Sequence, residues 1–361
     1  MPNTLTAEKP IAPAAAARDV RYDLLRITAA CMVVFLHTAG SKWHTVPHTD
    51  FSWLSMHIYN SFCRSAVPLF FMLSGAFLLK KEIPLKKLWL RKILPLGIIY
   101  IVWSFFYAID AVGWTSLFRT SPLTLIALSV KSHYHMWYIP TLAGLYILQP
   151  VLYAVIHFEN GKFVRYYLRV FFVLQILRAT VTLLCSDITV VQTAMSSLPM
   201  ELTRYAGYML LGYYLANIKP LRIKPRTALL GFCGTVILAA AIDTLFTYIR
   251  GDAKEMLYSY FSLPVFAEAV LLFTFAQSIN PNRLASPKAS AVVGTLSSLT
   301  FGVYLLHPFI LDKLETHLHL HPMSFAPILS IPVIAIIATI LSGAITFVML
   351  KLPVVKRLWK L

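Results

Sequence analysis

The sequence predicts an all-α integral membrane protein that crosses the bilayer about ten times and keeps both termini in the cytoplasm. The first observation is composition, since 58% of the 361 residues are hydrophobic and only 13% are charged. Soluble domains carry about 25% charged residues, so this chain cannot cover a surface that faces water. The second observation is a series of long apolar runs, and the third is the placement of positive charge along the chain.

Ten apolar runs follow one another along the sequence. Most of them reach, or can extend to, the roughly 20 residues that a membrane-spanning helix needs. The runs are continuously apolar rather than alternating, which argues against membrane β-strands. They cover residues 27–39, 66–79, 93–109, 136–156, 167–185, 205–216, 228–249, 261–277, 291–311 and 325–350.

The net charge of +17 follows a pattern that favours a membrane over nucleic acid as the partner. Lysine and arginine concentrate in alternate connections, which the positive-inside rule places in the cytoplasm. These connections are the N-terminal segment through Arg26 and residues 80–92, 157–169, 216–226, 280–290 and 351–361. The remaining connections are expected to face outward, and they are residues 40–60, 113–134, 186–200, 250–258 and 313–324.

The chain reads as one membrane domain, residues 21–352, between two short tails. Residues 1–20 are rich in alanine and proline and are expected to form a disordered cytoplasmic tail, and residues 353–361 form a basic cytoplasmic tail. The four cysteines have neither zinc-site nor disulfide-framework spacing. Buried free thiols are therefore expected, and no metal is.

Two ionisable residues share one face of the first predicted helix. Arg26 and His37 are eleven residues apart, which places them about 20° from eclipsed and about 16 Å apart along the axis. Ionisable groups inside a membrane span usually face a bundle interior or a wet cavity. This arrangement suits a donor that enters from the cytoplasm, such as a coenzyme A thioester. Cations would hold its phosphates, and His37 would act as general base on an acceptor hydroxyl.

Four motifs occur in a fixed order along the chain. Arg26 and His37 are followed by VPLFFMLSGAFLL at 67–79, HMWYIPTLAGLYILQP at 135–150 and FGVYLLHPFIL at 301–311. Together they resemble acyltransferase family 3, the integral-membrane acyltransferases, over roughly residues 20–350. Within that family the sequence is most similar to the branch that O-acetylates enterobacterial common antigen.

The resemblance implies a ten-helix core in a bacterial inner membrane and acetyl-CoA as the co-substrate from the cytoplasm. It implies transfer of the acetyl group to a hydroxyl of a periplasmic or lipid-linked glycan, for example one carried on undecaprenyl. It also implies that His37 is the catalytic residue and that Arg26 engages the donor.

One stretch departs from the family pattern. Where relatives often carry an Arg-x-x-Arg pair, this chain reads KKLWLRKILP at 86–95. Lys87 and Arg91 are spaced i, i+4 on one helical face and Lys92 is adjacent, so these three residues are expected to hold the CoA phosphates. The alternative interpretation is plain positive-inside anchoring.

Other polar residues are expected near the outer level of His37 and are candidates for acceptor binding. They are Arg64, His135, Trp137, Tyr304 and His307. The arginine would suit a phosphate or an acidic sugar, and the alternative is an interfacial arginine paired with an acid.

Ser74-Gly75 is expected to allow two helices to approach closely. Glu268, in the middle of a span, is either structural or orients His37.

A competing interpretation is a transporter or flippase for an acyl group or a lipid-linked glycan. No strong internal repeat is visible, and many transporters are built from inverted repeats. A non-catalytic scaffold is a second alternative, but it leaves the shared face of Arg26 and His37 unexplained.

Overall fold

The computed structural model describes residues 19–113, 115–185, 188–189, 204–251, 253, 257–280 and 286–359. Every regular element in these residues is a helix, which confirms the all-α prediction for the described part of the chain. The predicted N-terminal tail, apart from residues 19–20, lies outside the described residues. So do most of the predicted connection 186–200 and the last two residues of the basic tail.

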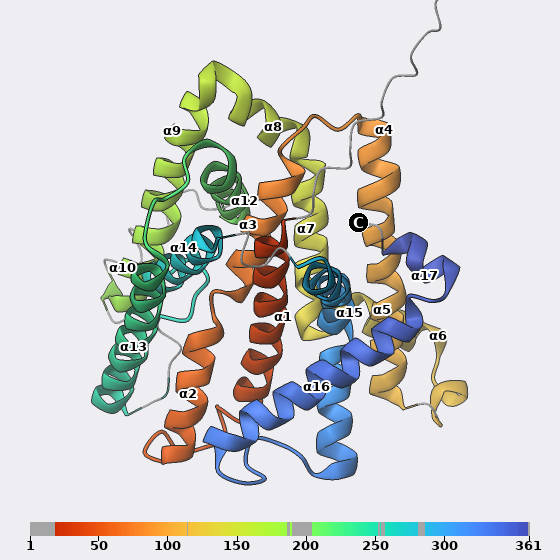
Figure 1. Ribbon diagram of the computed structural model, residues 1–361. Coiled ribbons are helices and arrows are strands. Elements are labelled where there is room, and N and C mark those ends of the chain that lie inside the picture. The colour runs from red at the N-terminus through yellow and green to blue at the C-terminus, as the bar shows by residue number, and fades with distance from the viewer. Residues whose placement is uncertain are drawn as a thin grey trace, which may run out of the picture.

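The helical segments follow the apolar runs of the sequence (Figure 1). In chain order they are α1 (Val20–Gly40), α2 (Phe51–Cys63), α3 (Ala66–Leu78), α4 (Leu85–Leu88), η1 (Trp89–Ile93), α5 (Leu94–Val112), η2 (Leu117–Arg119), α6 (Pro122–Lys131), η3 (Tyr134–Trp137), α7 (Tyr138–Ile147), α8 (Gln149–His157), η4 (Phe158–Gly161), α9 (Lys162–Phe171), η5 (Phe172–Leu177), α10 (Arg178–Leu184), α12 (Arg204–Tyr213), η6 (Tyr214–Ile218), α13 (Pro225–Arg250), α14 (Leu263–Ser278), α15 (Pro287–Leu318), α16 (Pro327–Met349) and α17 (Pro353–Leu358).

Within the described residues, seven helical stretches are long and apolar enough to cross a membrane. An eighth membrane span would consist of η3, α7 and α8 taken together. The helix axis bends by 54° at the short break between α7 and α8. The chain is therefore a multi-pass membrane protein. The two remaining predicted runs fall on α14 and on α12 with η6, which are shorter, so the count of ten spans stays a prediction.

The structure corrects the start of the second predicted helix. Residues 40–60 were expected to form an outer connection, but α2 begins at Phe51, with Asp50 as its N-cap, and continues into α3 as one 28-residue stretch. The apolar run begins only at residue 66 because α2 carries several buried polar side chains, which face the bundle instead of lipid. Arg64, expected at an outer helix start, instead lies at the junction of α2 and α3.

Helix α1 lies near the middle of the bundle and packs on α2, α3, α14, α15 and α16 (Figure 1). Arg26 contacts Ser297, 271 residues further along, and His37 contacts His307, 270 residues further along. This nearly constant offset shows that α1 and α15 run parallel in register. The site residues of α1 therefore each face a partner at the same level of α15.

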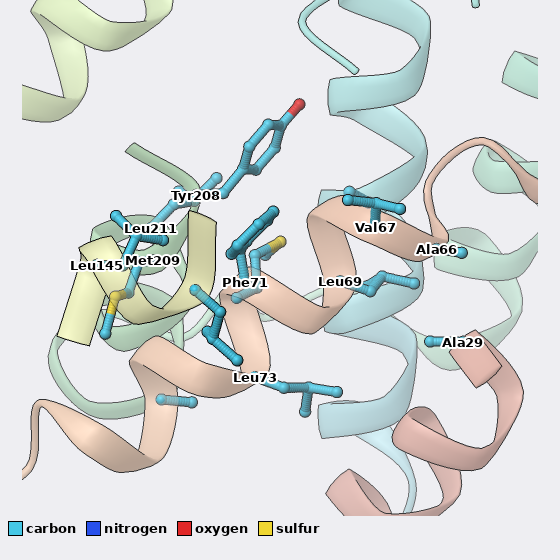
Figure 2. Packing of buried hydrophobic residues seen from close by; sticks show 14 of the residues in the cluster. Ala29, Ala66, Val67, Leu69, Phe71, Leu73, Leu145, Tyr208, Met209 and Leu211 are labelled. Atoms are coloured by element: carbon cyan, nitrogen blue, oxygen red, sulfur yellow. The ribbon is translucent and has the colours of Figure 1, made fainter. Parts of the chain in front are cut away.

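Helix α3 crosses α12 at very short range. A Cβ atom on Gly75 would overlap the carbonyl oxygen of Met209, and one on Gly212 would overlap the carbonyl oxygen of Met72. Figure 2 shows buried side chains around this crossing, including Phe71 of α3 and Met209 of α12. The Phe71 ring packs on Tyr205 of α12 with 4.6 Å between ring centres. The prediction that Gly75 allows two helices to approach closely is thus confirmed, and the crossing fixes the position of α3 beside α1.

Candidate functional site

A cavity of about 320 Å³, here called the central cavity, lies between α1, α3, α7 and α15. Helix α1 contributes Arg26, Val33 and His37, whose spacings of seven and four residues keep them on one helical face. The other three helices also present single faces, which carry Val67, Phe70, Leu73 and Ser74 on α3, Tyr138, Leu142 and Tyr146 on α7, and Ser297, Phe301 and Tyr304 on α15.

One end of the central cavity is set by Arg26. Its Nη1 lies 3.3 Å from Oδ1 of the buried Asp23 and donates to Ser297 Oγ over 3.2 Å. Ser297 in turn donates to Asp23 over 2.7 Å. The guanidinium also lies 5.8 Å from the centre of the Phe77 ring. A third of the Arg26 side chain stays exposed, so the cation is held in place yet remains accessible to an anion.

A pair of histidines sets the other end. His37 Nδ1 lies 2.6 Å from Nε2 of the fully buried His307, and His307 Nδ1 lies 2.9 Å from the Val303 carbonyl oxygen. A carbonyl only accepts, so His307 must carry its proton on Nδ1. In the neutral pair, His307 Nε2 then accepts from His37 Nδ1–H. This leaves the lone pair of His37 on Nε2, the atom that could act as a base.

Two more histidines complete the cluster. The Tyr304 hydroxyl donates to the His135 carbonyl over 2.7 Å, and His133 Nδ1 lies 2.8 Å from His135 Nδ1. Among the described residues, the buried Nε2 of His135 has no hydrogen-bond partner. Burial lowers the pKa of His133, while the carboxylates of Asp110 and Asp312 act in the opposite direction.

A second cavity, of about 200 Å³, begins on the other side of His37. Among the described residues, His37 lines both the central and the second cavity, and no other residue does so. Polar residues of the second cavity come from the end of α1, from the segment before α7 and from the end of α15, and they include Thr38, Ser41, His133, Tyr134, Asp312 and Glu315.

Of the residues expected from the sequence, Arg26, His37, His135, Trp137 and Tyr304 all line the central cavity. His307 lies behind His37 and contacts it directly. Trp137 stacks on Tyr260 with 5.9 Å between ring centres. The structure therefore brings together most of the predicted site, although it does not assign the roles of these residues.

Four predicted residues lie elsewhere. Arg64 packs over the Tyr258 ring at 4.4 Å and is not among the described residues that line either cavity. Lys87 and Arg91 border a separate shallow pocket together with Lys86, and Lys92 does not join them there. The π-helical turn η1 begins at Trp89, so the expected i, i+4 face of a regular α-helix is interrupted between Lys87 and Arg91.

Sequence reasoning missed three contributors to the two cavities. Ser297 looks like an ordinary polar residue within the apolar run 291–311, and its bond to Asp23 depends on tertiary packing. Trp359 belongs to the predicted basic tail, but it lines the central cavity and packs edge-to-face on Phe301 at 5.3 Å. Glu315 lies in a stretch that was expected to form an outer loop, whereas α15 continues through it.

Within the part of the chain that the structure describes, no group of three His, Cys, Asp or Glu side chains is arranged to hold a metal ion. The fold and the site define a multi-pass membrane protein in which the half-buried His37, paired with the buried His307, lies between two cavities. A family model described as an acyltransferase domain (Acyl_transf_3) matches residues 19–347. The chain therefore belongs to acyltransferase family 3 and is a membrane acyltransferase. No curated protein and no solved structure matches it.

Proposed function

We propose that this protein is a membrane O-acetyltransferase of a bacterial inner membrane, which moves an acetyl group from acetyl-CoA to a hydroxyl of a periplasmic or lipid-linked glycan. The observation that carries the proposal is the position of His37, which lines both the central cavity and the second cavity. A donor in one cavity and an acceptor in the other would meet at this imidazole.

The donor enters the central cavity from the end where Arg26 lies. The thin pantetheine arm follows the largely apolar walls of α3 and α7, and Arg26 binds an anionic group near the entrance through charge-assisted hydrogen bonds. Lys87 and Arg91, in their shallow pocket, attract the nucleotide phosphates from the cytoplasmic surface, where the positive-inside rule places them.

The acetyl transfer then needs one base and no covalent enzyme intermediate. The acceptor oxygen attacks the thioester carbonyl carbon while Nε2 of His37 takes the proton of that hydroxyl. The tetrahedral intermediate collapses, the carbon–sulfur bond breaks, and the thiolate takes the proton from His37. The products are the O-acetyl ester and free CoA, so atoms and charges balance without an added co-reactant.

His307 positions this base. It holds the Nδ1 proton of His37 at 2.6 Å and is itself fixed by the Val303 carbonyl. The imidazolium that forms on His37 during proton transfer keeps its Nδ1–H bonded to His307. The pair therefore sets both the tautomer and the orientation of the reacting ring. Glu268 is buried and is not among the described residues that line either cavity, so it is given no part in this step.

His135 supplies the hydrogen-bond donor for the negative charge that develops on the carbonyl oxygen. Its Nε2 is buried, lacks a partner among the described residues, and belongs to a side chain that lines the central cavity. In the tautomer in which His135 Nδ1 accepts from His133 Nδ1–H, Nε2 of His135 carries the proton. A donor of this kind is worth about 100-fold to 1,000-fold in kcat in acyl transfer.

The proposal is tested with purified protein in lipid nanodiscs, acetyl-CoA labelled in the acetyl group, and mass spectrometry of surface glycans from cells with and without the protein. Wild type should yield labelled ester, and the cells should show the matching acetyl mass. His37→Ala should lose transfer about 100-fold to 10,000-fold while still binding acetyl-CoA. Arg26→Ala should weaken acetyl-CoA binding.

Retention of full transfer by His37→Ala would refute the assigned base. Unchanged acetyl-CoA affinity in Arg26→Ala would refute the donor path. Uptake of an intact acyl or glycan compound into vesicles, without ester formation, would favour the transporter interpretation.

A further inference from the structure

Acidic and hydroxyl side chains are prominent in the lining of the second cavity. Asp312 and Glu315, one turn apart on α15, line it together with the hydroxyl groups of Thr38 and Ser41. No lysine or arginine is among the described residues that line it. The cavity therefore offers carboxylate and hydroxyl acceptors beside the ring groups of His37, His133, Tyr134 and His321. The absence of a lysine or arginine from this described lining contrasts with the net charge of +17 of the whole chain.

Two lysines hold these carboxylates without lining the cavity. Lys42 Nζ lies 2.5 Å from Glu315 Oε1. Lys313 Nζ lies 2.9 Å from Asp312 Oδ2 and 2.9 Å from Asp110 Oδ1. Within the described structure each of the two cavity carboxylates thus uses one oxygen for its lysine, and the other oxygen is available to a ligand. Asp110 and Asp312 share Lys313, while Glu315 pairs with Lys42, so the carboxylates in these two groups outnumber the lysines by three to two.

We propose that the second cavity is the acceptor site and that it selects a neutral or amino sugar over an anionic one. The inference rests on the proposed transfer at His37. Ionised carboxylates accept hydrogen bonds from sugar hydroxyls or from a protonated amine. The same groups repel a carboxylate or phosphate placed in the cavity. If the acceptor is carried on a lipid phosphate, that phosphate lies outside the cavity.

This assignment differs from the expectation that an arginine would bind a phosphate or an acidic sugar. Arg64 carried that expectation, and it packs on Tyr258 instead. Thr38 and Ser41 donate to backbone carbonyls of α1, at 2.8 and 3.0 Å, so their oxygens remain acceptors toward a ligand. Each of these four polar side chains of the second cavity therefore favours a ligand that donates hydrogen bonds.

The test compares three acceptor probes with purified full-length protein in nanodiscs at saturating acetyl-CoA. The probes are methyl β-N-acetylglucosaminide, methyl β-glucosaminide and methyl β-glucuronide, which are neutral, cationic and anionic. Wild type should use each of the first two with a kcat/KM at least about 10-fold above that for the glucuronide. Asp312→Asn and Glu315→Gln keep the shape of the side chain, and each should reduce this preference several-fold.

The change should appear in the KM for the acceptor, while the KM for acetyl-CoA stays within about 2-fold of wild type. Glu159→Gln is the matched control, because Glu159 pairs with Lys162 on the surface and lines neither cavity. This variant should keep the wild-type preference.

Three results would overturn the acceptor assignment. The first is equal use of the glucuronide, and the second is an unchanged preference in both carboxylate variants. The third is a wild-type protein that binds acetyl-CoA and hydrolyses it in a His37-dependent manner but acetylates neither the neutral nor the amino sugar. Failure of the underlying function is a different result, namely no binding of acetyl-CoA and no His37-dependent cleavage of its thioester.

Discussion

His37 and His307 are 270 residues apart in the chain, yet His37 Nδ1 and His307 Nε2 lie 2.6 Å apart. The Val303 carbonyl fixes the proton of His307 on Nδ1, and the proton of His37 is then fixed on Nδ1 as well. One carbonyl oxygen, at the end of this short chain of hydrogen bonds, thus determines which nitrogen of the neutral His37 ring keeps its lone pair.

The first prediction concerns His307. His307→Ala removes the acceptor for His37 Nδ1–H and should lower kcat about 100-fold, with little change in the KM for acetyl-CoA. His307→Gln offers a side-chain carbonyl to the same proton and should recover at least a part of the loss. Steady-state kinetics of both variants check this. Equal activity of the alanine variant and wild type would contradict a positioning role.

A second prediction concerns His135. His135→Leu removes the proposed donor to the carbonyl oxygen, so kcat should fall about 100-fold while acetyl-CoA binding is retained. His135→Gln can present an N–H near the same place and should retain more activity than the leucine variant. Burst kinetics and isothermal titration separate the two quantities. A loss of donor affinity with kcat preserved would mean that His135 only shapes the cavity.

The third prediction distinguishes two roles for Lys87 and Arg91 in their shallow pocket, namely binding of the CoA phosphates and anchoring at the membrane surface. Replacing Lys87 and Arg91 together by alanine should raise the KM for acetyl-CoA about 10-fold at low salt and less at high salt. The KM for acetyl-pantetheine, which lacks the nucleotide phosphates, should not change. Arg226→Ala, an exposed cation on α13 away from the cavities, is the matched control. An equal effect on both donors would leave these residues as anchors only.

The crossing of α3 and α12 predicts a sharp difference between two glycines. Gly75→Ala places a methyl group into the backbone of Met209 and should cost about 1–3 kcal/mol or prevent folding. Gly97→Ala on α5 meets no atom within 4 Å and should be neutral or stabilising by about 1 kcal/mol. Thermal unfolding in detergent, followed by intrinsic fluorescence, compares them. Similar melting temperatures for both variants would show that the crossing tolerates a side chain.

The positions of the helices were largely predictable, because hydrophobic runs of spanning length are a local property of sequence. The start of α2 was not predictable in this way. Its polar residues, such as His57 and Asn60, are buried inside the bundle. A prediction from hydropathy alone assigns such polar residues to a loop. The same error placed Arg64 at the outer start of a helix, whereas it lies at the junction of α2 and α3.

The site residues, like the helices, were predictable only where a local sequence pattern placed them. Helical periodicity was enough to place Arg26 and His37 on one face, and both line the central cavity. The partners of these residues come from α15, about 270 positions away, and no local pattern specifies such a pairing. Sequence motifs brought His307 into consideration, but only tertiary packing shows that it contacts His37 and is not among the described residues that line the second cavity.

The most direct test of the central claim is a side-specific transfer in proteoliposomes that supply acetyl-CoA only outside and a sugar acceptor only in the lumen. If donor and acceptor meet at His37 from opposite cavities, labelled ester will accumulate in the lumen, free CoA will stay outside, and His37→Ala will form neither. Ester formation only when both substrates share one compartment, or free CoA inside the lumen, would contradict the account.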